Sequence, residues 1–152
     1  MSERSEDRRL LREAIAFSRH APPSETAYSV GCIIAAPDGS IIATGYSRER
    51  GAKSHAEQVA IEKANEQHIP LTDATLYTSL EPCSVRASGL RACTDRILAA
   101  GIPRVVFAMR EPPLFVECKG AAMLADAGVD LVELAAEAPL VAQVNAHLLR
   151  KP

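Results

Sequence analysis

Four residues carry side chains that together could bind and use a metal ion: His55, Glu57, Cys83 and Cys93. The histidine and the two cysteines supply one imidazole and two thiolates, a zinc ligand set that leaves the fourth tetrahedral position open. Three protein ligands are typical of a catalytic rather than a structural zinc site. Glu57 lies two residues after the histidine and could exchange protons with a water molecule at the open position. The residue types therefore predict a catalytic Zn²⁺ centre.

Each of these residue types also has an ordinary structural explanation. A lone histidine at a helix start is often a cap or a surface residue, and a lone cysteine in a helix often packs as a small apolar group. Cys83 and Cys93 are also too far apart for the zinc-finger knuckle, in which two residues separate the thiols. The order of the four residues, at the ends of expected elements, favours the metal centre. The remaining histidines and cysteines are interpreted as packing or surface residues: His20, His68, His147, Cys32 and Cys118.

Alternating helix and strand patterns must position these four residues. Apolar spacing predicts helices over about 6–20, 55–67, 91–100 and 120–128, with a last helix opened by Pro139. Residues 28–47 have the pattern of a hairpin, and further strands are predicted over 74–80, 104–109 and 129–134. The order predicts an α/β fold of three α/β/α layers around a mixed, mostly parallel five-stranded sheet whose first two strands are antiparallel. Cys83 then follows a strand, at the sheet edge where such folds carry their sites.

Composition limits the class of protein. With 152 residues, 47% of them apolar, the chain is expected to form one domain over 1–152 with a substantial core. The charged first segment does not resemble a secretory signal, and no apolar run approaches a membrane span, so we expect a cytoplasmic protein without a membrane partner. Cysteines in a reducing compartment are better explained as thiols or metal ligands than as disulfides. A net charge of −2 makes nucleic acid an unlikely general partner.

The segments "HAEQVAIEKA" and "LYTSLEPC", with the later Cys93, resemble the cytidine deaminase superfamily, whose signature is H-x-E followed by P-C-x-x-C. The wide cysteine gap and the segment "RVVFAMREP" resemble more narrowly the pyrimidine deaminase domain of bifunctional riboflavin biosynthesis enzymes. This resemblance covers nearly the whole chain. It implies a cytidine deaminase-like fold, Zn²⁺ on His55, Cys83 and Cys93, and Glu57 as the proton shuttle of a hydrolytic deamination. Because no sequence remains for a reductase domain, we expect a stand-alone deaminase.

Residues outside the metal set are candidates for substrate binding: Tyr28, Arg48, Arg86, Arg91 and Glu111. Arg86 and Arg91 could meet a phosphate or another anionic group, and two solvated arginines are an equally good interpretation. Tyr28 could stack on a heterocycle or pack at the edge of the core. Neither alternative is decided by the sequence.

Four positions depart from the pattern of the riboflavin-pathway deaminases. They are Ala27-Tyr28 in place of Asn-Pro, Arg48 near a usual histidine, Val85 with Ala87 or Ser88 in place of a histidine and a lysine, and Glu111-Pro112 in place of Asp-Pro. Because these positions surround one pocket, we expect a different substrate, with the riboflavin intermediate a poor one.

Several functions remain open. The favoured one is hydrolytic deamination of a small aminopyrimidine or related aminoheterocycle, as a free base, nucleoside or nucleotide. The alternatives are the riboflavin-pathway diaminohydroxyphosphoribosylaminopyrimidine deaminase, a nucleic-acid base deaminase, and a non-catalytic zinc-stabilised partner subunit, against which Glu57 argues. Such folds expose apolar helix faces, so a homodimer or higher homo-oligomer is expected.

Overall fold

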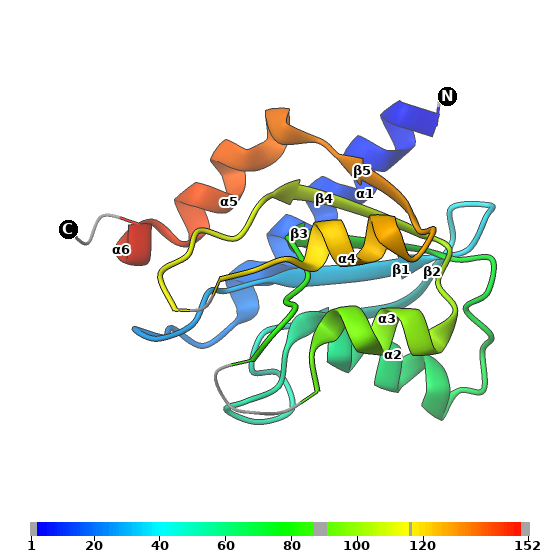
Figure 1. The fold of residues 1–152 in the computed structure, drawn as a ribbon, viewed down its shortest axis with the longest axis horizontal. Helices are drawn as coiled ribbons and strands as arrows, with labels where there is room; N and C mark the ends of the chain where they lie inside the picture. Colours follow the sequence, from blue (N-terminus) through cyan, green and yellow to red (C-terminus); the bar gives the residue numbers. More distant parts are fainter. Residues whose placement is uncertain (1–2, 87–90, 116, 150–152) are drawn as a thin grey trace.

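A mixed five-stranded sheet forms the centre of the molecule (Figure 1). The computed structural model describes residues 3–86, 91–115 and 117–149. The strands are β1 (Gly31–Ala35), β2 (Ile41–Tyr46), β3 (Thr75–Leu80), β4 (Arg104–Met109) and β5 (Asp130–Glu133), in the order β2-β1-β3-β4-β5. β1 pairs antiparallel with both β2 and β3, whereas β3, β4 and β5 pair in parallel, so β1 alone among these five strands is reversed. The predicted mixed, mostly parallel sheet is confirmed.

Helices cover both faces of the sheet. They are α1 (Glu3–Phe17), α2 (Ala56–Glu66), α3 (Cys93–Ala100), α4 (Gly120–Asp126), α5 (Ala138–Val144) and α6 (Ala146–Leu149), with short 3-10 turns η1 (Ser18–His20) and η2 (Ala135–Glu137). Helices α1, α5 and α6 pack on one face, and α2, α3 and α4 pack on the other. The predicted α/β/α layers are confirmed.

Alternating side chains in β1 create the two cores. Ile33 joins the cluster under α1, while Cys32 and Ile34 join the cluster under α2. Because both faces are covered, every residue of β1 is buried. This explains why its sequence is a continuous apolar run rather than an alternating one.

The start of α3 differs from the prediction. The apolar pattern placed the helix start near Arg91, but α3 begins at Cys93 because Ala92 has extended backbone angles of φ −66° and ψ 150°. The predicted end is correct, since Gly101 closes the helix in the left-handed conformation with φ 73°. Cys93 is therefore the first residue of a helix rather than an interior one.

Close contact between α2 and β2 depends on a glycine. A Cβ atom on Gly45 would overlap the main-chain oxygen of Ala56, the first residue of α2. The missing side chain lets the start of α2 lie directly against the sheet. His55 directly precedes Ala56, so this contact also places His55 close to β2.

Among the described residues, no helix has both the length and the apolar character needed to cross a bilayer.

A buried ion pair joins α1 to the sheet. Asp7 is 1% exposed and accepts hydrogen bonds from the Tyr77 hydroxyl at 2.8 Å and from the Arg104 guanidinium at 2.8 and 2.6 Å. Burial alone would raise the pKa of Asp7, but the bonds from Arg104 and Tyr77 outweigh it and hold the pKa below its usual value. The ionised carboxylate is thus the form that the fold stabilises.

Replacing Asp7 should destabilise the protein in a pH-dependent way. Asp7→Asn removes one partner of a buried pair and should lower the free energy of unfolding by about 3 kcal/mol near neutral pH. A lowered folded-state pKa stabilises the fold above the unfolded-state pKa, and this contribution is lost as pH falls through the folded-state value. Urea unfolding should therefore show the gap between wild type and variant narrowing below about pH 4.

The control is Glu13→Gln, which removes an exposed ion pair with Arg9 on the same helix and should cost less than about 1 kcal/mol. A gap between wild type and Asp7→Asn that stays constant down to acid pH would contradict the role of the carboxylate.

Candidate metal centre and active site

Three segments distant in sequence bring possible metal ligands together. His55 precedes α2, Cys83 lies three residues after the end of β3, and Cys93 begins α3. The Nδ1 atom of His55 lies 3.6 Å from the Cys83 Sγ and 3.4 Å from the Cys93 Sγ. All three donor atoms lie within 4.8 Å of one another, and among the described residues this is the one such group of three.

The spacing of these atoms fits a tetrahedral zinc ion. Usual Zn–N and Zn–S bond lengths at a tetrahedral angle separate the nitrogen from each sulfur by about 3.6 Å. The observed separations of 3.6 and 3.4 Å agree with this value. The donor set also matches the soft ligands that zinc prefers. These residues could therefore hold the ion without a rearrangement of the backbone.

Main-chain amides of α3 donate hydrogen bonds to Cys83, one of the possible metal ligands. The Cys93 amide donates to the Cys83 Sγ at 3.2 Å, and the Thr94 amide donates to the Cys83 carbonyl at 3.1 Å. Hydrogen bonds from Cys93 lower the pKa of the Cys83 thiol despite its burial. A lowered pKa favours the thiolate, which is the form that ligates a metal.

Glu57 lies beside this group in the first turn of α2. It is 4% exposed, and it lines the same cavity as His55 and Cys83. Burial, with the negative charge of Cys83 as a second cause, raises the pKa of Glu57 to about 7. A carboxyl group with such a pKa can both accept and donate protons near neutral pH.

Glu81 has a structural role that the sequence analysis did not identify. Its buried carboxylate accepts the Glu111 amide at 3.0 Å and the Ala121 amide, at the start of α4, at 2.9 Å. Its own amide donates to the Met109 carbonyl at 2.8 Å. Glu81 thus ties the segment that carries Cys83 to the end of β4 and to α4. The sequence shows only an acidic residue before Pro82, which does not distinguish this role from that of a solvent-exposed carboxylate.

A cavity of about 240 Å³ opens beside the three donor atoms. Its walls come from the segment before β1, the loop between β2 and α2, and the segments after β3 and β4. Among the residues predicted to contact substrate, four line the cavity: Tyr28, Arg48, Arg86 and Glu111. Arg91 does not line it in the described structure and instead borders a hollow between α2 and α3. Ala87 and Ser88 lie outside the described residues.

Tyr28 forms one wall together with Phe115, which the sequence analysis missed. The Tyr28 hydroxyl donates to the Pro112 carbonyl at 2.8 Å. Its ring meets the Phe115 ring edge to face, with centroids 5.3 Å apart. Phe115 is 40% exposed, so the pair carries an apolar surface from the core to the mouth of the cavity. Phe115 lies in the short apolar sequence PPLFV, which has neither helix nor strand periodicity and so gave no signal that could have revealed this contact.

Arg48 binds protein groups at the cavity wall. Its Nε and Nη2 atoms donate to the Pro22 carbonyl at 2.9 and 2.7 Å, Nη1 to the Tyr28 carbonyl at 3.2 Å, and Nη2 to the Ser29 hydroxyl at 3.0 Å. Its backbone has φ 64°, which is unusual for a residue with a side chain. The guanidinium therefore fastens the segment before β1 to the end of the hairpin.

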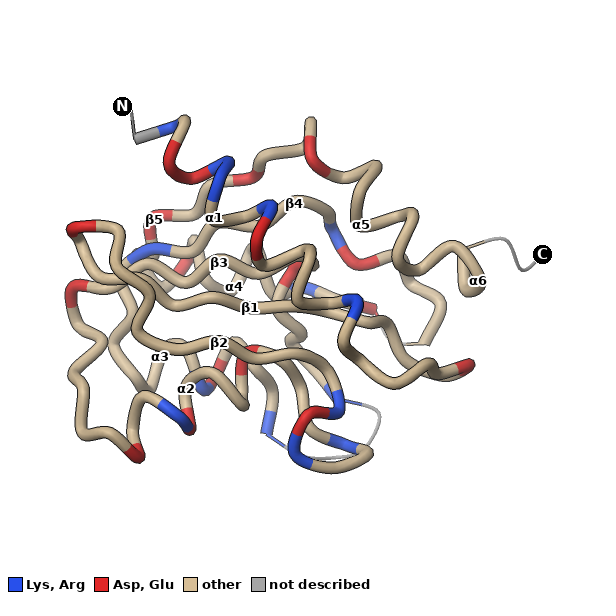
Figure 2. Tube along the Cα trace, turned by 180° about the vertical axis from the view of Figure 1, so that it is seen from behind, with Lys and Arg blue, Asp and Glu red and all other residues tan. Residues whose placement is uncertain are grey.

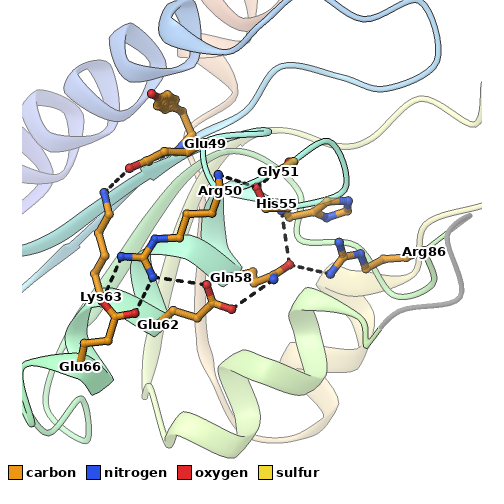
Figure 3. Close-up of polar contacts among 11 residues, drawn as sticks. Glu49, Arg50, Gly51, His55, Gln58, Glu62, Lys63, Glu66 and Arg86 are labelled. Atoms are coloured by element: carbon orange, nitrogen blue, oxygen red, sulfur yellow. Dashed lines mark hydrogen bonds and ion pairs between the residues drawn. The ribbon is translucent and has the colours of Figure 1, made fainter.

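Arg86 and Arg91 differ in burial. Arg86 is 5% exposed and bonds to Gln58, Lys53 and Arg91, as the close-up in Figure 3 shows for Gln58. Arg91 is exposed, and its Nη2 donates to the Asp95 carbonyl at 3.4 Å. The two arginines thus lie in different environments, although the sequence analysis gave both the same two interpretations.

Glu111 adds a second perturbed carboxyl group to the cavity. Burial first, and then the nearby charges of Cys83, Glu57 and Glu81, raise its pKa to about 8. One of its oxygens, Oε2, is buried and has no hydrogen-bond partner within the described ranges. The protonated form could donate a hydrogen bond to a group in the cavity.

The other thiols are held away from the metal group. Cys32 is fully buried in β1, and burial raises the pKa of its thiol. Cys118 donates its thiol to the Pro82 carbonyl at 3.3 Å. Cys32 is thus a packing residue, as its sequence context predicted, whereas the hydrogen bond of the partly buried Cys118 had no signal in the sequence.

The profile of the family described as "Cytidine and deoxycytidylate deaminase zinc-binding region" matches residues 4–109, which contain all three donor residues and Glu57. The chain belongs to this family. The resemblance inferred from the sequence is confirmed. The match ends with β4, so α4, β5 and the C-terminal helices lie beyond the part that defines the family.

Similar proteins of known name refine this assignment. The diaminohydroxyphosphoribosylamino-pyrimidine deaminase of Schizosaccharomyces pombe is 38% identical over 80% of this chain, and the riboflavin biosynthesis protein RibD of Escherichia coli is 37% identical over 76%. The chain spans only 30% and 28% of those relatives. Among solved structures, the Aspergillus oryzae Rib2 deaminase in complex with DARIPP superimposes with a TM-score of 0.72 at 28% identity, covering 84% of each chain. The similarity therefore concerns deaminase domains.

The bonds of Arg48 predict a local effect of its replacement. Arg48→Lys keeps the positive charge but cannot reach three acceptors with a planar fork, so residues 22–29 should be held less firmly. Hydrogen exchange measured by mass spectrometry should then be at least about tenfold faster in peptides covering 22–30, corresponding to about 1.4 kcal/mol in local opening. Arg50→Lys is the control, because Arg50 bonds to exposed Glu66. Unchanged exchange in Arg48→Lys would show that the segment is held by other contacts.

Proposed function

We propose that this protein is a zinc-dependent enzyme that removes an amino group, by hydrolysis, from a small aminopyrimidine or a related aminoheterocycle. The observation that carries the proposal is the convergence of His55, Cys83 and Cys93 beside a cavity that also contains the buried carboxyl group of Glu57. Membership in a family described by its zinc-binding region supports the same metal and the same class of reaction.

The proposed chemistry divides between the metal and the chain. Zinc on the three donor residues would act as a Lewis acid that lowers the pKa of water in the cavity. Glu57 would transfer the first proton of the attacking water to the ring nitrogen, and then the second proton, from the hydroxyl group formed on the ring carbon, to the departing amine. A C–O bond forms at the ring carbon, the C–N bond breaks, and ammonia leaves.

One substrate has specific support. The S. pombe and A. oryzae relatives are named for, or bound to, diaminohydroxyphosphoribosylaminopyrimidine or DARIPP. The expectation of a different substrate rested on four departures from the family pattern around the pocket, and it included an arginine that would contact a polar or anionic group of the new substrate. However, Arg48 and Arg86 bond to acceptors within the protein. The riboflavin-pathway intermediate is therefore the second candidate, and the first to be assayed.

A nucleic-acid substrate has less support. Figure 2 shows basic and acidic residues mixed along the trace, including in the loop between β2 and α2, rather than a stripe of one sign. A protein that binds nucleic acid by its phosphates usually gathers Lys and Arg on one face.

We also propose a homodimer or higher homo-oligomer, because Leu98 on α3 and Met123 on α4 are 36% and 37% exposed on the outer helix layer.

The substrate assay measures ammonia release from a panel of free bases, nucleosides, nucleotides and ribosylaminopyrimidine phosphates. We expect release from at least one aminopyrimidine. A specificity constant above about 10⁴ M⁻¹s⁻¹ for the riboflavin intermediate would identify it as the natural substrate. No release from any compound of the panel by zinc-loaded, folded protein would contradict the proposed activity.

Zinc content should depend on the two converging cysteines. The purified protein should bind about one zinc per chain, and Cys83→Ser or Cys93→Ser should lose it, because two remaining ligands hold the ion weakly. Elemental analysis of dialysed protein measures this. Cys32→Ser and Cys118→Ser are matched controls and should keep the metal. Full zinc retention in Cys93→Ser would refute the ligand assignment.

Glu57 should be needed for turnover but not for metal binding. Glu57→Gln keeps the shape of the side chain and loses the proton-accepting carboxylate, so turnover should fall by about 10²–10⁴-fold. Zinc content and the unfolding midpoint should stay close to those of the wild type. Steady-state kinetics on the substrate found in the panel give the comparison. Wild-type turnover in this variant would rule out the proton-shuttle role.

A further inference from the structure

Arg86 connects the three segments that carry the metal ligands. It lies three residues after Cys83, and its guanidinium reaches acceptors near each of the other two ligands. Nη1 donates to the Gln58 Oε1 at 2.9 Å and to the Arg91 carbonyl at 3.1 Å, and Nη2 donates to the Lys53 carbonyl. Lys53 is two residues before His55, and Arg91 is two residues before Cys93. One planar group therefore spans the supports of all three ligands.

Gln58 links this guanidinium directly to His55. Its Oε1 accepts the main-chain amide of His55 at 3.4 Å as well as Nη1 of Arg86 (Figure 3). This is the side-chain half of a capping box at the start of α2. The Gln58 Nε2 donates to the Glu62 Oε2 at 3.2 Å, so the amide is oriented with its oxygen toward Arg86. The position of His55 is thus coupled to that of Arg86 through one oxygen atom.

The guanidinium of Arg86 is buried, so its hydrogen bonds must offset the free energy lost when it leaves water. Arg86 is 5% exposed, and within the described residues its acceptors are neutral, an amide oxygen and two carbonyls, while its Nε has no hydrogen-bond partner there. A cation removed from water among neutral groups needs several well-directed hydrogen bonds to offset the lost hydration. A planar guanidinium supplies such bonds in a fixed fork, and a lysine ammonium does not.

The hydrogen bond from Arg86 to the Arg91 carbonyl also helps to bring together the two thiols, which lie ten positions apart in the sequence. It joins Arg86, three residues after Cys83, to Arg91, two residues before Cys93. The amides of Cys93 and Thr94 then bond to Cys83 itself. Together these contacts bring Cys93 back to Cys83 without the two-residue turn of a zinc knuckle.

We propose that Arg86 is a positioning residue for the metal centre: its fork, acting through Gln58 and two main-chain carbonyls, sets His55 and Cys93 relative to Cys83. The inference rests on the proposed zinc site and assigns a role to a residue outside the ligand set. It differs from the anion contact considered from the sequence, in which Arg86 would act on substrate. The two roles predict different measurements.

The test compares Arg86→Lys with wild type in metal binding and in spectroscopy. Zinc affinity is measured by competition with a chromophoric chelator, and the ligand geometry is measured by the thiolate-to-cobalt absorption of the Co²⁺-loaded protein. Loss of a partner that orients ligands typically weakens metal binding by about 10–100-fold. We expect a loss in this range together with an altered cobalt spectrum, while circular dichroism shows a folded protein.

The matched control is Arg12→Lys, which loses a fork of two hydrogen bonds to Glu137 on the opposite face of the sheet. It should leave zinc affinity and the cobalt spectrum unchanged. Gln58→Leu is the second variant, and it carries the test if Arg86→Lys does not fold. It removes the shared oxygen without touching the charge and should weaken zinc binding as well. The double variant should lose less affinity than the sum of the two single losses, because both act through one contact.

Wild-type zinc affinity and an unchanged cobalt spectrum in both Arg86→Lys and Gln58→Leu would overturn the positioning role. A raised Michaelis constant with unchanged metal binding in Arg86→Lys would overturn it as well, in favour of an anion contact. If the wild-type protein bound no zinc, the proposed function would fail and this inference with it. Zinc in the wild type with no effect of the variants would remove the positioning role alone.

Discussion

Three donor atoms from residues 55, 83 and 93 can share one ion only if the start of α2, the end of β3 and the start of α3 meet at the same edge of the sheet. The order β2-β1-β3-β4-β5 produces this meeting, because the chain leaves β3 at the edge over which α2 begins. Gly45 lets α2 approach β2 closely enough for His55 to reach the cysteines. A fold of the same composition with a different strand order would separate the donors by the width of the sheet.

Buried polar side chains link the segments around the three donor atoms by hydrogen bonds. Glu81 accepts amides from the segment after β4 and from the start of α4, Arg48 fastens the segment before β1, and Arg86 spans the three ligand segments. Each joins main-chain groups of irregular segments that no helix or strand partner satisfies. Such groups must find a hydrogen bond when they are buried, and a side chain with several donors or acceptors can satisfy two or three at once. Three charged residues that line the cavity, Glu81, Arg48 and Arg86, are therefore engaged by hydrogen bonds within the protein itself.

These internal hydrogen bonds change the interpretation of the arginines near the cavity. Arginines near a predicted active site suggest contact with an anionic substrate, yet here Arg48 and Arg86 bind carbonyl groups. The perturbed carboxyl groups are Glu57 and Glu111, whose burial beside the Cys83 thiolate raises the pKa of each. Recognition at this cavity is better explained by groups that can donate or accept single hydrogen bonds, with the aromatic wall of Tyr28 and Phe115, than by a cluster of free cations.

The sequence by itself determined the layers of the fold, the mixed sheet and the family, and it predicted the candidate residues His55, Glu57, Cys83 and Cys93, because periodicity and motif spacing are local properties of the chain. It predicted α3 two residues too early, since the extended backbone of Ala92 has no signal in its residue type. The partners of Arg48, Arg86, Glu81 and Phe115 were decided only by the tertiary structure. A long side chain carries the same identity whether it meets solvent, substrate or a carbonyl, and only the packed arrangement of distant segments selects among these partners.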